Sequence, residues 1–399
     1  MRIAFYNHTS AVSGAEISML LTAKHFSKAE PIIFAPEGEV LERAQSIGIR
    51  VMPTPSYRAR LRKNPFLLIK DMIGMLAAGW KLASILKKEP IDLIHANSIR
   101  AGIMAGLFKW YHKTPIIWHM RDIPPKGLVG RAVKLLGRIT AEGFIGISKS
   151  VLENFSDSSL KARSYLVHNG VELTYIGDQE KQDYRKKIRE ELRTPQNAKV
   201  ATIIGQIAPW KRQEDAIRAT AKLIQDGTEV FLWIVGIAKF RKENELYFET
   251  LKSLVYELGI EDRVIFAGFR EDVLEICCAS DILLLCSDNE PFGRVVIEAM
   301  SQGTPVIGTE AGGVPEIIRN GINGMMYPVS EYIKLSHLMS QLFNDPQLMK
   351  RLSDNGLLNA EQNFSIKQTA EKVENIYQNV LQGDASRSID PAHSREVAK

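Results

Sequence analysis

The sequence predicts an α/β protein with two doubly wound, Rossmann-like domains, each built on a parallel sheet. Short apolar, β-branched runs alternate with stretches of helical periodicity along nearly the whole 399-residue chain. Continuous apolar strands with helices between them are typical of parallel sheets that are covered on both faces. The alternation is interrupted once, at residues 173–197, and a chain of this length suits two domains better than a single core.

We expect six strands in the first domain, residues 1–172, and five in the second, residues 198–365. Most of them lead through Gly, Ser, Asn or Pro into an amphipathic stretch, as strands of βαβ units do. Ligands bind at the carboxyl ends of strands in such sheets, so the loops that follow the strands are candidate sites. The expected strands are 2–7, 31–35, 92–96, 115–119, 143–147 and 164–168 in the first domain, and 199–204, 230–235, 263–267, 281–286 and 304–308 in the second.

Three further segments complete the predicted organisation. Residues 173–197 carry a highly charged helix followed by Thr194-Pro195, and we interpret them as an interdomain linker. Residues 366–382 have the pattern of an amphipathic helix, which we expect to cross back to the first domain. The polar residues 383–399 are predicted to be a flexible tail.

The composition excludes several classes of protein. A hydrophobic content of 45% and a charged content of 24% are those of a globular protein rather than a disordered or fibrous one. We expect no secretory signal, because Met1 leads straight into a strand-like segment. Cys277, Cys278 and Cys286 form no C-x-x-C pair, so we predict free thiols, a cytoplasmic location and no metal site.

The charge is distributed unevenly between the two halves of the chain. The net charge is +5, but residues 1–172 hold 24 Lys and Arg against 13 Asp and Glu, whereas the remainder holds 27 against 33. This asymmetry predicts an anionic partner for the first half alone. A nucleic acid, a membrane surface and an acidic or phosphorylated substrate would all fit that charge.

An apolar stretch in the first half, residues 65–80, follows the cation-rich residues 58–63. Lys70 and Asp71 interrupt it, so we do not expect a membrane span. Two interpretations remain: a long surface helix packed on its sheet, which we favour, and an interfacial amphipathic helix with a basic edge.

The strongest candidate for a binding site is the segment from Asp281 to Glu298. Its pattern predicts a buried strand, a turn-rich loop and a helix that begins at Arg294. The N–H groups and the dipole at a helix N-terminus favour an anion, and a diphosphate is the natural one. Because Glu290 and Glu298 would repel phosphate, we expect them to accept hydrogen bonds from hydroxyls, which a sugar and a ribose both supply.

Two more loops of the second domain follow predicted strands. One runs from Gly205 to Lys211, and its lysine is a cation suited to neutralising a leaving phosphate. The other contains Gly312-Gly313, where a ligand or another backbone can approach closely, and we expect a helix to begin near Pro315.

Two strand ends of the first domain also carry polar residues. The segment Asn7–Glu16 resembles a phosphate-binding turn but lacks G-x-G-x-x-G, so no dinucleotide cofactor is predicted. His119, Arg121 and Asp122 lie at the end of another strand, and three ionisable groups at a carboxyl end favour a ligand-facing role.

Together these residues resemble the family 4 retaining glycosyltransferases, of glycosyltransferase group 1 type and GT-B architecture, in which two Rossmann-like domains face each other across a cleft. The resemblance extends through about residue 382 and is strongest in the second domain. Each short motif is common, but the ordered set is specific. The matching stretches are Gly14-Ala-Glu16, His119 with Arg121-Asp122, Gly146-Ile-Ser148-Lys-Ser150, His168-Asn169-Gly170-Val171, Gly205 with Lys211, Gly236, Ala267-Gly-Phe269, Glu290 to Glu298, Gly303-Thr-Pro305-Val306 and Gly312 to Glu316.

The resemblance implies an enzyme that moves a sugar, with retention, from a UDP- or GDP-sugar to a hydroxyl of a glycan or lipid-linked glycan. It implies no metal and no other cofactor, and a role in cell-surface polysaccharide or glycolipid synthesis in the cytoplasm. Because the first domain is basic, we also expect peripheral contact with the anionic inner face of a membrane.

The resemblance assigns roles to particular residues as well. It implies that His119, Glu290 and Lys211 are catalytic, with the histidine approaching the transferred sugar and the lysine facing the diphosphate. It implies that Arg121, Asp122 and Asn169 contact the acceptor or line the cleft. The implied donor-binding residues are Gly14, Gly205, Gln206, Lys211, Arg212, Gly236, Phe269, Glu290, Phe292, Gly293, Arg294, Val295 and Glu298.

Two positions depart from the family pattern. Gln206 stands where relatives usually carry an arginine that neutralises phosphate, and we hypothesise that Arg294 or Arg212 replaces that charge. Ser13-Gly14 stands where a Gly-Gly pair is common, so we expect the closure of this loop to differ.

Two other functions fit the same architecture, a sugar-nucleotide epimerase and a non-catalytic nucleotide-sugar-binding protein. An epimerase needs acid and base groups on the sugar ring, and the sequence shows no distinctive set. A non-catalytic protein would be expected to lose Glu290, Glu298 and Lys211. All three are present at the positions of the family pattern. Nucleic-acid binding is not predicted, because the second half is acidic and basic loops lack interleaved aromatic residues.

Overall fold

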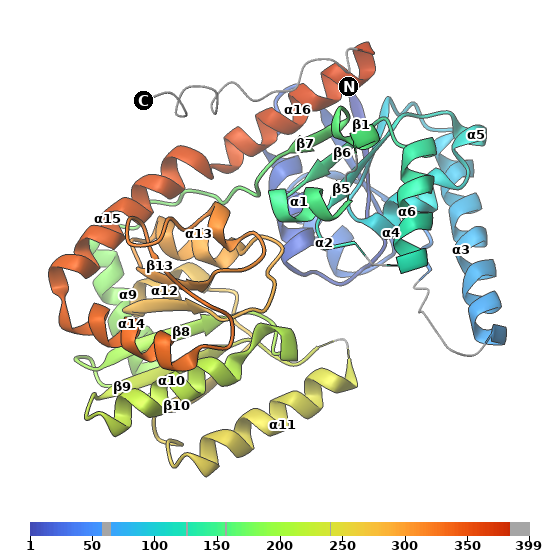
Figure 1. The fold of residues 1–399 in the computed structure, drawn as a ribbon. Coiled ribbons are helices and arrows are strands. Elements are labelled where there is room, and N and C mark those ends of the chain that lie inside the picture. Colours follow the sequence, from blue (N-terminus) through green and yellow to red (C-terminus); the bar gives the residue numbers. More distant parts are fainter. Residues whose placement is uncertain (58–64, 125–126, 156–157, 240, 384–399) are drawn as a thin grey trace. The chain divides into compact units, whose positions relative to one another are not determined.

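The computed structural model describes residues 1–57, 65–124, 127–155, 158–239 and 241–383. The chain forms two compact units (Figure 1). Unit 1 consists of Met1–Gly170 together with the chain from Ile366 onward, and unit 2 consists of Val171–Ser365. The cation-rich residues 58–63 and the predicted tail from residue 384 lie outside the described residues.

Unit 1 is built on a seven-stranded sheet in the order β3-β2-β1-β4-β5-β6-β7, and all of its pairs are parallel. The strand order reverses between β1 and β4, and ligands bind at such switch points in doubly wound folds. The strands are β1 (Arg2–Tyr6), β2 (Glu30–Ala35), β3 (Arg50–Pro53), β4 (Leu93–Ala96), β5 (Ile116–Met120), β6 (Gly143–Gly146) and β7 (Ser164–Leu166).

The last helix, α16 (Ile366–Gln382), belongs to unit 1 although it follows unit 2 in the sequence. Its Val373, Ile376 and Tyr377 pack into the core of unit 1. The buried Glu374 carboxylate accepts hydrogen bonds from the backbone N–H groups of residues 27–29, at 2.6–3.0 Å. The other helices of unit 1 are α1 (Gly14–Lys24), α2 (Glu39–Ser46), α3 (Pro65–Leu86), α4 (Ile99–Gly106), α5 (Lys109–His112), α6 (Gly127–Thr140), α7 (Lys149–Phe155) and α8 (Ser158–Lys161).

Unit 2 is built on a six-stranded sheet in the order β10-β9-β8-β11-β12-β13, again parallel throughout. Its order reverses between β8 and β11, so the loops after these two strands flank the switch point. The strands are β8 (Lys199–Ile204), β9 (Val230–Val235), β10 (Val264–Gly268), β11 (Ile282–Leu285), β12 (Val306–Thr309) and β13 (Met325–Tyr327).

Helices and short 3-10 turns connect the strands of unit 2, and an apolar core formed by strands and helices together stabilises it. The helical elements are α9 (Asp178–Glu191), η1 (Pro209–Lys211), α10 (Gln213–Gln225), α11 (Lys242–Glu257), α12 (Val273–Ala279), α13 (Arg294–Ser301), η2 (Val314–Glu316), α14 (Tyr332–Asn344) and α15 (Pro346–Asn363).

The prediction of two doubly wound parallel sheets is confirmed, and every expected strand is present with its ends within two residues. Two strands, β3 and β13, go beyond the prediction. Both are edge strands whose apolar runs, of two and three residues, end at Pro53 and Pro328. Among the described helices, none is long and apolar enough to cross a membrane.

Residues 173–197, the predicted interdomain linker, are part of unit 2 in the structure. Helix α9 lies against α12, and Arg189 is fully buried. Its guanidinium donates to the backbone carbonyls of Ala279 and Ala198, and it pairs with Asp281 at 3.0 Å. One arginine of this charged segment therefore makes satisfied, buried hydrogen bonds, whereas most of the other charged side chains are exposed.

The prediction of a helix beginning near Pro315 is wrong. Only the 3-10 turn Val314–Glu316 follows Gly313. Ile317 and Ile318 are buried immediately after it, and the Arg319 N–H donates to the Asn323 side chain at 2.7 Å, which turns the chain toward β13. The loop that contains Gly312 therefore carries no helix dipole.

Candidate functional site

Three loops of unit 2 meet at the carboxyl edge of its sheet. They follow β8 (residues 205–212), β11 (residues 286–293) and β12 (residues 310–313), and we call them the unit 2 loop cluster. The Asp288 N–H donates to the Trp210 carbonyl at 2.9 Å, and the Gly313 N–H donates to the Glu290 carbonyl at 2.8 Å. These backbone bonds join segments that lie far apart in the sequence.

Two glycines of unit 2 allow backbones to approach closely. Gly312 has a φ of +61°, and a Cβ there would lie 2.1 Å from the Glu290 carbonyl oxygen. Gly236 has a φ of +142°, and a Cβ there would lie 1.8 Å from the Gly205 carbonyl oxygen. Only glycine fits either position, so both residues fix the backbone under the candidate site.

Lys211 and Glu290 form the central ion pair of the cluster. The Lys211 Nζ lies 2.6 Å from the Glu290 Oε2, and both side chains are largely buried. The Ser287 hydroxyl donates to the same carboxylate oxygen at 2.8 Å, and the Lys211 Nζ lies 4.4 Å from the centre of the Trp210 ring. The structure thus brings together two of the three residues predicted to be catalytic.

A second ion pair lies at the start of α13. Arg294, the first residue of the helix, pairs with Glu298 one turn later, with Nε 3.0 Å from Oε1. Gly293 precedes the helix with a φ of +103°. The first N–H groups of a helix, here those of Arg294 and Val295, have no intrahelical partner and suit an anion.

Arg212 and Gln206 have different surroundings. Arg212 is bound to Asp215 at 2.7 Å and lies 3.7 and 3.4 Å from Glu214 and Asp288. The hydrogen bonds to Asp215 raise the pKa of its guanidinium. The Gln206 amide donates to the Lys239 carbonyl at 2.9 Å. Of the two proposed replacements for the missing arginine, Arg212 is surrounded by more negative charge than Arg294.

The other predicted donor residues divide into core and surface positions. Phe292 is buried and packs against Phe364, with ring centres 6.0 Å apart, so only its backbone could contact a ligand. Phe269 is exposed, and the Lys239 Nζ lies 4.8 Å from its ring centre. In unit 1, Gly14 begins α1 and follows Ser13, whose N–H and hydroxyl donate to Glu16 in a capping box.

Unit 1 carries a buried polar network at its switch point. The His119 Nδ1 at the end of β5 lies 2.9 Å from the His95 Nε2 of β4. Arg121 donates to the side-chain oxygens of Asn97 and Asn169 at 2.5 and 3.0 Å. Burial, and then the charge of Arg121, hold the pKa of His119 well below its usual range. The imidazole is therefore neutral at physiological pH.

The structure brings His119, Arg121 and Asn169 together as the sequence suggested, whereas Asp122 is exposed. Sequence reasoning missed His95, Asn97 and Tyr377. The two polar residues His95 and Asn97 at the end of an otherwise apolar strand were a usable signal. Tyr377 gave none, because its place depends on the return of α16 to unit 1.

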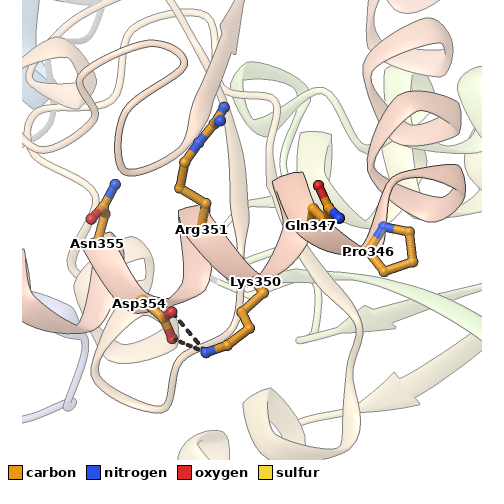
Figure 2. Close-up of a pocket in the computed structure, with 6 residues that line it drawn as sticks. All are labelled: Pro346, Gln347, Lys350, Arg351, Asp354 and Asn355. Atoms are coloured by element: carbon orange, nitrogen blue, oxygen red, sulfur yellow. Dashed lines mark hydrogen bonds and ion pairs between the residues drawn. The ribbon is translucent and has the colours of Figure 1, made fainter.

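Figure 2 shows a surface pocket on α15 in unit 2. Lys350 and Asp354 form an exposed ion pair there at 2.8 Å. None of its residues belongs to the unit 2 loop cluster, and it lacks the convergent buried polar groups typical of an active site. Its lining residues are Pro346, Gln347, Lys350, Arg351, Asp354 and Asn355.

The cysteines Cys277, Cys278 and Cys286 carry free thiols. Burial raises the pKa of all three; that of Cys278 is raised to about 11. Within the described part of the chain, no group of three or more His, Cys, Asp or Glu side chains is placed to hold a metal ion.

Comparison with known proteins gives a match on each half of the chain. Residues 184–358 match the family model described as glycosyl transferases group 1. Residues 12–175 match the model described as glycosyltransferase family 4.

Several relatives and solved structures are similar to the chain. N-acetyl-alpha-D-glucosaminyl L-malate synthase of Bacillus anthracis is 28% identical over 79% of this chain and 81% of that protein. The lipopolysaccharide core biosynthesis glycosyltransferase LpsE of Rhizobium meliloti is 32% identical over 42% of this chain and 46% of its own length. Anabaena HepE, solved with UDP-glucose, superposes with a TM-score of 0.82 at 24% identity, over 95% of this chain and 100% of that one. This likeness confirms the predicted GT-B fold.

Proposed function

The chain belongs to the family 4 glycosyltransferases, and on this premise we propose that it moves a sugar from a nucleotide-diphosphate donor to a hydroxyl of a glycan or lipid-linked glycan. The ion pair of Lys211 and Glu290, held in the unit 2 loop cluster, is the observation that carries the proposal. HepE was solved with UDP-glucose, and LpsE is named for lipopolysaccharide core biosynthesis, which supports a sugar-nucleotide donor and a role in making cell-surface glycans.

In this proposal, donor binding exchanges the partners of the ion pair. A diphosphate supplies acceptor oxygens for the Lys211 ammonium, and the sugar hydroxyls then donate to Glu290. Separating a buried ion pair is costly unless each charge finds a new partner, and a sugar nucleotide offers a partner to both. A free sugar or inorganic phosphate offers a partner to one charge only. The pair therefore favours the whole donor over either part.

The start of helix α13 would hold the diphosphate and the ribose of the nucleotide. The N–H groups of Arg294 and Val295 suit the diphosphate, and Glu298 suits the ribose hydroxyls. Arg294 is paired with Glu298 before binding, and it lies on the first turn of the helix. It can therefore move from the carboxylate to a phosphate while Glu298 accepts from the ribose.

The proposed chemistry is transfer with retention. The bond between the anomeric carbon and the diphosphate oxygen breaks, the acceptor oxygen bonds to the same face of that carbon, and its proton passes to the leaving diphosphate. Lys211 and the start of α13 would stabilise the negative charge that develops on the leaving group. His119, which burial keeps neutral, is proposed to contact the substrate from unit 1.

A binding titration followed by a donor screen tests this function. The wild-type chain is titrated with UDP, GDP and ADP, and sugar derivatives of the nucleotide that binds are then tested for slow hydrolysis. We expect one nucleotide to be preferred and one of its sugars to be released with retained configuration. Release of an epimer of the intact donor would show an epimerase instead, and binding without any turnover would show a non-catalytic binding protein.

We also propose a peripheral contact between unit 1 and an anionic membrane. Helix α3 carries an exposed apolar stripe with a spacing of three and four residues, in which each side chain is between 44% and 81% exposed. Helix α6 carries a similar stripe, and both helices pack against α4. The stripes consist of Phe66, Ile69, Ile73, Leu76 and Trp80 on α3, and of Leu128, Leu135 and Ile139 on α6.

The charges on these two helices also support an anionic membrane as the partner of the apolar stripes. Lys70, Lys81, Arg131 and Arg138 are exposed on the same two helices. Apolar side chains that enter the headgroup region beside lysine and arginine are typical of helices that lie on anionic lipid. The exposed stripe favours the interfacial interpretation of α3 over a helix that only packs on its sheet.

A further inference from the structure

Three buried side chains of unit 1 form a continuous hydrogen-bonded chain that ends at His119. The Tyr377 hydroxyl of α16 lies 2.6 Å from the His95 Nδ1, and the His95 Nε2 lies 2.9 Å from the His119 Nδ1. We call these three residues the histidine chain. Each is at most 2% exposed.

The direction of the donors along this chain follows from Arg121. The Arg121 Nη2 lies 3.4 Å from the His119 Nδ1, and a guanidinium can only donate. The His119 Nδ1 is therefore an acceptor without a proton, and the proton of this imidazole sits on Nε2. His95 must then donate from its Nε2, which leaves its Nδ1 to accept the Tyr377 hydroxyl hydrogen.

The opposite direction fails on two counts. It would place a proton on the His119 Nδ1, facing the Arg121 guanidinium. It would also require the Tyr377 hydroxyl to accept from His95, and among the described residues that hydroxyl has no second partner to which it could donate. A buried hydroxyl without an acceptor is unfavourable.

The rings of the histidine chain are held in place by their neighbours. His95 stacks on Phe5 with ring centres 4.4 Å apart, and Tyr377 packs edge-on against Phe26. Glu374, one turn before Tyr377, is fixed by backbone N–H groups of residues 27–29. The chain is therefore preorganised before any ligand binds.

The last nitrogen of the histidine chain, the His119 Nε2, faces no protein acceptor among the described residues. The His119 Nε2 is buried and has no hydrogen-bond partner among the described residues. It lies at the carboxyl end of β5, where ligands bind in doubly wound sheets. An unpaired buried N–H is unfavourable, so an oxygen that accepts from it would be bound preferentially.

We infer that Tyr377 and His95 are positioning residues that fix His119 as an N–H donor toward an acceptor oxygen on the sugar of the substrate. His119 then orients the substrate and does not remove a proton from it. The identity of this oxygen rests on the proposed function. The direction of the hydrogen bonds along the histidine chain does not.

Nitrogen NMR of the ligand-free protein tests the direction of the hydrogen bonds along the histidine chain. With 15N-labelled histidine, and with His119→Gln and His95→Gln used for assignment, both rings are expected to be neutral with the proton on Nε2. A proton on the His119 Nδ1, or a charged His119 near neutral pH, would overturn the inference whether or not the protein transfers a sugar.

Steady-state kinetics tests the positioning role. His95→Leu removes the donor to His119 and is expected to lower kcat at least tenfold with little change in the KM for the donor. His95→Gln places an amide N–H where the ring Nε2 was and is expected to restore most of the loss. Tyr377→Phe should lower kcat less, because the ring of His95 loses one of its two hydrogen bonds, and the proton of His95 should stay on Nε2.

Tyr165→Phe is the matched control, because Tyr165 packs into the same core without bonding to either histidine. It is expected to leave kcat unchanged. Equal losses in His95→Leu and His95→Gln, or in Tyr377→Phe and Tyr165→Phe, would show a merely structural role. If the tautomers are as expected but no sugar nucleotide is turned over, the proposed function fails and the direction of the chain stands.

Discussion

The two units present polar residues at the carboxyl ends of similar sheets, but in opposite electrostatic states. In unit 2 the residues are charged and paired with one another, as Lys211 is with Glu290 and Arg294 with Glu298. In unit 1 the central residues His95 and His119 are neutral, since burial holds the pKa of each well below its usual range.

This difference predicts different responses to a ligand. Ion pairs can exchange partners, so unit 2 can release a cation for phosphate and a carboxylate for hydroxyls in one step. The two neutral histidines of unit 1 are held by buried hydrogen bonds beside the cationic Arg121, and His119 offers one unpaired N–H. We therefore expect unit 2 to provide the affinity for the nucleotide, and unit 1 to provide orientation.

Glu290→Gln gives the largest expected effect. The amide keeps the shape of the side chain but loses the charge that accepts from the sugar hydroxyls, so turnover should fall by about two to three orders of magnitude. Because Lys211 loses its partner, affinity for the free nucleotide should stay the same or increase. The measurements are kcat and the calorimetric affinity for the free nucleotide. Weaker nucleotide binding with unchanged turnover per bound donor would contradict the proposed role of Glu290.

Arg294→Ala and Arg212→Ala separate the two cations that could replace the arginine missing at Gln206. Loss of Arg294 leaves Glu298 unpaired beside the diphosphate, so nucleotide affinity should fall about tenfold or more, as expected for a hydrogen bond to a charged group. Arg212 is already bound to Asp215, so its loss should change affinity less than about threefold. Unchanged affinity in both variants would exclude the compensation.

Ile73→Ser on α3 gives the smallest expected effect, and it concerns unit 1 alone. Loss of part of one apolar contact should weaken co-sedimentation with anionic phosphatidylglycerol vesicles by roughly fivefold. Leu246→Ser, an equally exposed position on α11 of unit 2, is the control and should have no effect. Binding that is the same on neutral and anionic vesicles would remove the charge argument.

The sequence was sufficient for most strands of the sheets and for the loops that carry the candidate site residues. Buried parallel strands have a continuous apolar pattern, and the loop after each one begins where that pattern stops, which locates Lys211, Glu290 and His119. It was not sufficient for β3 and β13, because their apolar runs are only two and three residues long and end at Pro53 and Pro328.

Hydrogen-bond partners that depend on tertiary packing could not be predicted from the sequence either. The charged pattern of α9 resembles a solvated surface, and only the fold shows that Arg189 is buried against backbone carbonyls. Tyr377 reaches His95 across 282 positions of sequence because α16 returns to unit 1. The helix expected after Gly313 failed for the same kind of reason, since Ile317 and Ile318 are drawn into the core.

The division of roles between the units can be tested by calorimetry with the nucleoside diphosphate that the wild-type chain prefers. Lys211→Ala is expected to weaken its binding about tenfold to a hundredfold, since a hydrogen bond to a charged phosphate is lost. Lys350→Ala, which breaks an exposed ion pair in the same unit, and His119→Ala in unit 1 should each change the affinity less than about twofold. Undiminished binding by Lys211→Ala, with a large loss in His119→Ala, would contradict the account.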